Sequence, residues 1–196
     1  RILVFWQAGS YMKAALVTFS GSAGSESFTT NTVHQYSSDS IDNFFGSQDI
    51  SSYPKAIGTT GHFLRTYKNT SSQARSVTLR VSGTSVSTSS NTQILISSGI
   101  TFNVDYAINP EDPTKGFMSY RDANGKWIVR PFTVVDQGSN QRSISLGTAE
   151  EIATNASNDQ GFVKLVYVDG DHFVSSCKRD SGGGYRVDTI LVKYVG

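Results

Sequence analysis

The sequence predicts an all-β fold, an antiparallel two-sheet β-sandwich of the jelly-roll type with one or two short helices. Three observations support this prediction. Apolar and polar residues alternate along much of the chain, turn residues separate the alternating stretches, and Gly, Ser, Thr and Asn supply 75 of the 196 residues. The 20 Phe and Tyr residues and two Trp residues provide apolar surface for a core, so we expect residues 1–196 to form a single domain.

Period-two alternation marks strands in the first part of the chain. It is clearest at residues 76–82, where Val and Leu at every second position are separated by Ser, Thr and Arg. Residues 62–67 and 100–106 follow the same pattern. We expect each segment to be a strand with one face on the core and the other face in solvent.

Turn residues divide the last third of the chain into hairpins. Asp-Ala-Asn-Gly at residues 122–125 joins two strands, because an Asn-Gly pair readily adopts the positive φ values of a tight turn. Asp-Gly-Asp at 169–171 and Ser-Gly-Gly-Gly at 181–184 are the next two turns. They predict a meander of three hydrophobic strands, at residues 162–168, 172–178 and 185–195.

Two short segments carry helix signals. Residues 148–151 read as a capping box ahead of Ile152, and residues 40–46 end at a glycine that would stop one further turn. Pro131 interrupts a long strand and indicates a bulge or an edge position. Residues 82–92, of which eight are Ser or Thr, fit either a polar edge strand or a surface loop.

Charge and composition argue against several kinds of partner. The formal net charge is +1 with scattered basic residues, whereas a nucleic-acid interface needs clustered cations, so no specific nucleic-acid binding is expected. The single cysteine, Cys177, allows no disulfide framework. His34, His62 and His172 lack the spacing of zinc ligands, and we expect neither a metal nor a cofactor. The longest apolar stretches are too short to predict a transmembrane segment.

Three fragments contain residues of the kinds used in a catalytic triad. The segments ending at His62 (Thr-Thr-Gly-His) and surrounding Ser181 (Arg-Asp-Ser-Gly-Gly) resemble the histidine and nucleophile motifs of chymotrypsin-like serine proteases, and Asp105 lies between them. The resemblance implies a triad of these three residues. The sequence departs from the family at Arg179, which occupies the position of the oxyanion-hole glycine, and only 15 residues follow Ser181. We therefore interpret residues 180–184 as a hairpin turn and predict no catalytic residue.

A second polar cluster lies in the turn at residues 169–172. Asp169, Asp171 and His172 offer oxygen and nitrogen atoms to a cation, but calcium needs six to eight oxygen ligands. The cluster is therefore interpreted as hairpin chemistry and not as a metal site.

Aromatic residues near turns are the remaining candidates for a binding site. Tyr53 lies in a Ser-rich region, and Tyr120, Trp127 and Tyr185 flank predicted hairpin ends. Exposed aromatic rings beside Asn, Asp and Ser can stack on sugars while polar groups bind hydroxyls, so these four residues are the predicted ligand-binding set. For Trp127, a position in the core is the favoured interpretation.

These observations predict a non-enzymatic structural or attachment module. The leading hypothesis is a self-assembling virion protein (capsid, tail or fibre) or an extracellular surface subunit, because strand faces rich in Ser and Thr can pack against identical copies with little desolvation. The expected partners are copies of itself and possible glycans or cell-surface receptors. The alternative is a secreted recognition protein, either a lectin or a pore-forming toxin that inserts residues 2–16, and a serine hydrolase ranks below both.

The expected location is a virion or the extracellular space. The chain starts at Arg1 and not at Met, so we expect that an upstream segment was cleaved or omitted. Asn69 and Asn155 each begin an Asn-x-Ser sequon, which would matter only on a secretory route.

Overall fold

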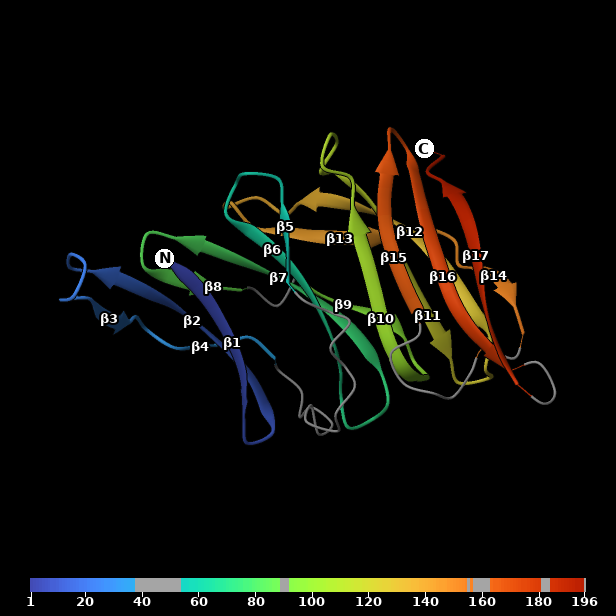
Figure 1. Ribbon diagram of the computed structural model, residues 1–196, viewed down its shortest axis with the longest axis horizontal. Helices are drawn as coiled ribbons and strands as arrows, with labels where there is room; N and C mark the ends of the chain where they lie inside the picture. The colour runs from blue at the N-terminus through green and yellow to red at the C-terminus, as the bar shows by residue number, and fades with distance from the viewer. Residues whose placement is uncertain (38–53, 89–91, 155, 157–162, 181–183, 196) are drawn as a thin grey trace.

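The structure is a computed structural model that describes residues 1–37, 54–88, 92–154, 156, 163–180 and 184–195. Strands account for 67% of the residues and helix for 1%. In the described residues, seventeen strands form four antiparallel sheets, which we number 1 to 4 in chain order (Figure 1). The predicted all-β, antiparallel, sandwich-like fold is confirmed, with four sheets in place of the two that were expected.

Sheets 1 and 2 come from the first half of the chain. Sheet 1 has the order β1-β2-β3, and β4 also pairs with β2. Sheet 2 has the order β5-β6-β7-β8, and β9 also pairs with β7. The strands of sheet 1 are β1 (Ile2–Ala8), β2 (Tyr11–Ser20), β3 (Ser27–Thr30) and β4 (His34–Gln35). Those of sheet 2 are β5 (Lys55–Ile57), β6 (His62–Lys68), β7 (Ala74–Ser82), β8 (Ser85–Ser87) and β9 (Gln93–Ser97).

Sheets 3 and 4 come from the second half. Sheet 3 has the order β10-β11-β12-β13, and β14 also pairs with β12. Sheet 4 is the meander β15-β16-β17. The strands of sheet 3 are β10 (Ile100–Ile108), β11 (Lys115–Asp122), β12 (Trp127–Asp136), β13 (Arg142–Leu146) and β14 (Glu150–Ala153). Those of sheet 4 are β15 (Val163–Asp169), β16 (His172–Asp180) and β17 (Tyr185–Lys193).

The four sheets are stacked in chain order, and an apolar core lies between each sheet and the next. Core 1/2 lies between sheets 1 and 2 and includes Met12, Leu16, Val77 and Leu79. Core 2/3 includes Ile57, Leu64, Met118 and Phe132. Core 3/4 includes Phe117, Trp127, Leu165 and Phe173. Sheets 1 and 4 are therefore the outer layers, and each has one face that no other sheet of the described residues covers.

Sheets 2 and 3 lie inside this series and are covered on both faces. In β7, Val77 and Leu79 face core 1/2, while Ser76 and Thr78 on the opposite face are also buried, at 0% and 1% exposure. Asp105 in β10 is likewise buried, at 5% exposure. The expectation that these polar positions face solvent is wrong, because a further sheet covers the face on which they lie.

Pro131 lies in β12 at the point where this strand changes its pairing partner. Strand β12 pairs with β14 as far as Val129 and with β13 from Phe132 onward. The carbonyl of Pro131 accepts a hydrogen bond from the N–H of Gly147 at 2.9 Å, so the proline nitrogen faces the junction between the two partner strands. A missing N–H is tolerated at such a break in the ladder.

The helix expected at residues 148–153 is absent, because this segment forms strand β14 instead. Glu150 and Glu151 pair with Val129 and Ile128 along the edge of β12. The capping box is a local signal, and the free edge of a neighbouring strand offers backbone hydrogen bonds that outweigh it. The other predicted helix, at residues 40–46, lies outside the described residues.

The predicted strand pairings of the last third are confirmed, and so are the turns at residues 122–125 and 169–171; of the third predicted turn, residues 181–183 lie outside the described part. Gly125 has φ +77°, and the Asp122 carboxylate accepts the N–H groups of Asn124 and Lys126 at 2.9 and 2.8 Å. Gly170, with φ +47°, turns the chain between β15 and β16. Within residues 82–92, a short strand pairs with β7 at Ser85–Ser87, and residues 89–91 lie outside the described part.

Candidate interaction surface

The residues of the serine-protease resemblance have structural partners. His62 is 1% exposed, and its Nε2 donates a hydrogen bond to the Asn140 carbonyl at 3.0 Å while Nδ1 contacts the Thr60 hydroxyl at 2.9 Å. Asp105 accepts the N–H groups of Leu165 and Tyr106, each at 2.9 Å. These polar atoms of His62 and Asp105 therefore join strands and loops within the fold. Ser181 lies outside the described residues.

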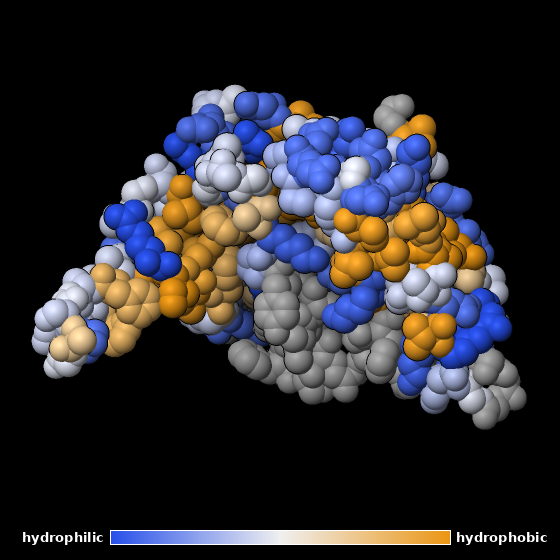
Figure 2. Space-filling model, turned by 45° about the horizontal axis from the view of Figure 1, so that its top comes forward, coloured by the Kyte–Doolittle hydropathy of each residue, from blue (hydrophilic) through white to orange (hydrophobic). Residues whose placement is uncertain are grey.

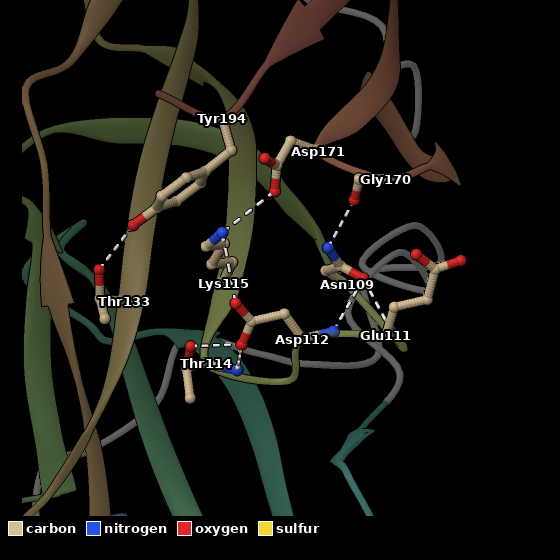
Figure 3. A network of polar contacts seen from close by, with 9 residues as sticks. All are labelled: Asn109, Glu111, Asp112, Thr114, Lys115, Thr133, Gly170, Asp171 and Tyr194. Carbon is tan, nitrogen blue, oxygen red and sulfur yellow. Dashed lines mark hydrogen bonds and ion pairs between the residues drawn. The ribbon is translucent and has the colours of Figure 1, made fainter. Parts of the chain in front are cut away.

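The acidic turn at residues 169–172 is joined to the β10–β11 loop by a polar network (Figure 3). The ammonium group of Lys115 lies 3.2 Å from Asp171 and 3.3 Å from Asp112. The hydroxyl of Thr114 donates to Asp112 at 2.5 Å and, with this ion pair, holds the pKa of the Asp112 carboxyl below its ordinary value. The hydrogen bonds to Asp171 and Asp112 in turn raise the pKa of Lys115.

Further hydrogen bonds join the turn at residues 169–172 to the β10–β11 loop and stabilise the turn itself. Asn109 donates its side-chain N–H to the Gly170 carbonyl at 2.6 Å, and His172 Nδ1 lies 3.0 Å from Asp169. The carboxylates of Asp169 and Asp171 thus have a histidine and a lysine as neighbours. Among the described residues, no group of three or more His, Cys, Asp or Glu side chains is arranged to hold a metal ion. The network joins a sheet 3 loop to a sheet 4 hairpin.

The four aromatic residues of the predicted ligand-binding set are not brought together. Tyr120 is 4% exposed in core 2/3. Trp127 is 1% exposed in core 3/4, where its indole N–H donates to the Ser119 hydroxyl at 2.9 Å. Neither ring can reach a ligand while its core is closed. Tyr53 lies outside the described residues.

Tyr185 is the member of this set that lies at the surface, with 61% exposure. It begins β17, and the ammonium group of Lys178 lies 3.6 Å from the centroid of its ring. This is a cation–π contact. One face of the ring is therefore already in contact with a cation, and a ligand that stacked there would have to displace the lysine.

Tyr185 belongs to a larger apolar surface on the uncovered face of sheet 4. Alternation places every second residue of each strand on this face, and the paired rows run across all three strands. One row is Val166, Val174 and Leu191, and the next is Lys164, Ser176 and Thr189. Figure 2 shows apolar residues gathered over the part of the molecule where Figure 1 draws β15–β17.

The side chains of this surface are strongly exposed for apolar residues. We call the set the sheet 4 outer face; its exposed apolar members are Val166 (56%), Val168 (48%), Tyr185 (61%), Val187 (66%) and Leu191 (64%). Three lysines lie on the same face: Lys164 in the middle row with Ser176 and Thr189, Lys178 in the next row beside Val187, and Lys193 at the end of β17. The apolar row of Val166, Val174 and Leu191 is separated from Val187 and Tyr185 by the row that contains Thr189. Exposed apolar side chains gathered on one face are typical of an interaction surface.

Sheet 1 carries a second, smaller exposed apolar contact. Phe19 and Phe28 face each other across β2 and β3 with ring centroids 4.8 Å apart, and they are 43% and 67% exposed. This pair lies on the β2–β3 hairpin, which extends from one end of the molecule in Figure 1. The two outer sheets thus both present apolar side chains to solvent.

Sequence reasoning missed the sheet 4 outer face. In β17, apolar residues occur on both faces, with Val187 and Leu191 outward and Ile190 and Val192 toward core 3/4. The signal in the sequence was this two-sided apolar character, which is typical of a strand covered on both faces. The described residues contain no sheet that covers the second face.

Comparisons with known proteins give no family for this chain. No protein-family model matches the sequence, and no curated protein matches it significantly. The described residues include no helix with the length and apolar character needed to cross a membrane.

Proposed function

We propose that this protein is a non-enzymatic structural subunit that assembles with copies of itself, in a virion (as a capsid, tail or fibre protein) or at an extracellular surface. The observation that supports the proposal is the sheet 4 outer face, on which large apolar side chains at about half to two thirds exposure cover an outer sheet. Removing such side chains from water is the main favourable term in protein association.

The dimensions of sheet 4 set the area that its outer face offers to a second copy. Nine-residue strands at about 3.3 Å per residue and three strands about 4.8 Å apart give a flat face on the order of 400 Å². Only part of this area is apolar, because the face also carries Lys164, Ser176, Lys178 and Thr189. Apolar patches on monomers reach roughly 300–600 Å² and are often functional. Apolar side chains such as Val166 and Leu191 adjoin a middle row of polar side chains that includes Lys164 and Thr189, so a contact here would combine apolar burial with polar pairing.

The composition of the chain as a whole supports a structural role. Ser and Thr make up 47 of the 196 residues, and charged residues only 17%. Hydroxyl-bearing side chains cost less to desolvate than Lys or Glu, so the remaining strand surfaces can also lie close to neighbouring subunits. We propose a virion or the extracellular space as the location of such a subunit.

The proposal is tested by measuring the mass of the protein in solution with a matched pair of variants. Leu191 lies on the sheet 4 outer face and is 64% exposed, and Leu95 on β9 of sheet 2 is 42% exposed. The wild-type protein should sediment as species larger than its 21.2 kDa monomer as concentration rises. Leu191→Lys should shift the protein to monomers, because a lysine ammonium resists burial, while Leu95→Lys should leave the assembly intact.

Two results would count against self-assembly. A wild-type protein that remains monomeric at high concentration, in sedimentation and in electron micrographs, contradicts the proposal. If Leu95→Lys and Leu191→Lys weakened the assembly equally, the sheet 4 outer face would not be the surface through which the copies assemble. Circular dichroism of both variants checks that neither has lost the fold.

A further inference from the structure

Strand β17 is an outer strand of sheet 4. Among the described residues it pairs with β16 alone, over the full nine residues from Tyr185 to Lys193. Its second edge therefore presents backbone N–H and C=O groups over about 30 Å. In Figure 1, β17 runs along one side of the molecule.

The usual devices that prevent an edge strand from pairing are sparse in β17. It contains no proline, and its register with β16 runs without a bulge. Its charged residues are Arg186, Asp188 and Lys193, of which only Lys193 lies on the outer face. The inward-facing charge of Asp188 is balanced within the chain, by Arg179 at 2.8 Å and Arg186 at 3.2 Å. A long, regular, apolar edge of this kind is a template for another strand.

The outward side chains of β17 match those of a second β17 strand that runs antiparallel to it. When two copies of β17 are aligned antiparallel with Thr189 at the centre, Val187 of one copy lies opposite Leu191 of the other, and Tyr185 lies opposite Lys193. The central Thr189 then meets its own equivalent. On the outward face these apolar, cation–aromatic and Thr–Thr pairs are favourable across antiparallel strands. On the inward face Arg186 lies opposite Val192 and Asp188 opposite Ile190, where the charges keep their partners within the chain, and no like charges face each other.

We propose that β17 pairs antiparallel with β17 of a second copy about a twofold axis at Thr189, joining two copies of sheet 4 into one six-stranded sheet. This inference rests on the proposed self-assembly and specifies its interface. A twofold contact of this kind is isologous, so it closes after two copies and leaves both sheet 1 ends free for other contacts. The apolar outer faces of the two sheets become one continuous surface.

Thr189 and Ser176 distinguish this arrangement from a stacking of two outer faces. They are cross-strand neighbours in the same row, with hydroxyl oxygens 2.9 Å apart. In the edge-paired dimer the two Thr189 residues are one strand spacing apart, with Cβ atoms about 5 Å from each other. The two Ser176 residues are three spacings apart, or about 14 Å. A disulfide needs Cβ atoms within about 4.5 Å after small adjustments.

The test is disulfide cross-linking of Thr189→Cys, with Ser176→Cys as the matched control, under mild oxidation of the full chain. Non-reducing gels should show covalent dimers for Thr189→Cys and only the wild-type background for Ser176→Cys. The native Cys177 is buried at 2% exposure, so it contributes little to either. Sedimentation of each variant under reducing conditions gives the mass before cross-linking.

The outcomes separate this inference from the proposed function. If the protein assembles but Thr189→Cys cross-links no better than Ser176→Cys, the β17 pairing is overturned and self-assembly stands. Equal, strong cross-linking of both variants would favour stacked outer faces and also overturn it. A wild-type chain that stays monomeric at all concentrations overturns both.

A charge-exchange variant supplies an independent check. Leu191→Glu or Val187→Lys alone should weaken the dimer by at least on the order of tenfold, because each charge faces an apolar residue of the second copy. The double variant places Lys at 187 opposite Glu at 191 of the second copy, twice in each dimer, and should recover the lost affinity. Within one strand these positions are about 13 Å apart, so recovery requires contact between copies. Failure of the double variant to recover dimers while remaining folded contradicts the register.

Discussion

Cys177 shows how the layered fold changes the chemistry of one side chain. It lies in core 3/4 at 2% exposure. Burial raises the pKa of its thiol from 9.0 to about 11, against the opposing charge of Arg179. A thiol is a nucleophile only as the thiolate, so this cysteine should be inert in the folded protein.

Alkylation of Cys177 with iodoacetamide at pH 8 should accordingly be slow in the folded protein and fast in denaturant, as measured by mass spectrometry. Between pH 9 and 11 the unfolded chain releases the thiol proton while the folded chain keeps it, so the free energy of unfolding should fall as pH rises through this range. The Ser176→Cys variant, with its thiol on the outer face, is the fast-reacting control. Equal rates for the two cysteines in the folded protein would contradict the burial.

The candidate site was only partly predictable at the residue scale. Trp127 and Tyr185 both flank hairpin ends in the sequence, yet one is 1% and the other 61% exposed. Alternation assigns each residue to a face of its strand, but it does not say what covers that face. For Trp127 the neighbouring sheet 4 supplies the cover, whereas the outer face that holds Tyr185 has no such layer among the described residues.

At the scale of elements, local signals predicted strands and turns well where no competing partner was present. The Asn-Gly turn before Trp127 forms as expected, because its chemistry depends on adjacent residues alone. The capping box at residues 148–151 gave the wrong element, because the edge of β12 lies beside it in space. Pairing with a distant strand cannot be read from a short window of sequence.

Gly116 in β11 tests the close packing of sheet 3. A Cβ atom there would lie 2.3 Å from the ring of Phe132 and 2.6 Å from the Ala107 carbonyl oxygen. Gly116→Ala should therefore lower the free energy of unfolding by about 1–3 kcal/mol or more, since β10 or the ring must shift. Urea denaturation measures this loss.

Gly170→Ala is the comparison for that substitution. Gly170 has φ +47°, and the space that an added Cβ atom would occupy is open. Only the backbone conformation therefore opposes alanine there, at a cost of about 1–2 kcal/mol. If Gly116→Ala proves the milder of the two, the contact between Gly116 and Phe132 is looser than the structure indicates.

At the scale of the whole molecule, the order of the sheets should govern local stability. Sheets 2 and 3 are covered on both faces, while all four residues of β3 in sheet 1 are exposed. Amide hydrogen exchange, followed by mass spectrometry of peptides, should therefore be slowest in β6, β7, β11 and β12 and fastest in β3. Protection of β3 equal to that of β7 would contradict the layered arrangement.

The sequence by itself determined the all-β class, most hairpins and the meander of sheet 4. These follow from period-two alternation and from turn residues, which act over a few neighbouring positions. Only the tertiary structure decided that four sheets enclose three cores, that Ser76 and Thr78 are buried, and that the outward row of β17 faces solvent. The physical reason is that alternation defines two faces of a strand, whereas burial depends on which distant sheet lies against each face.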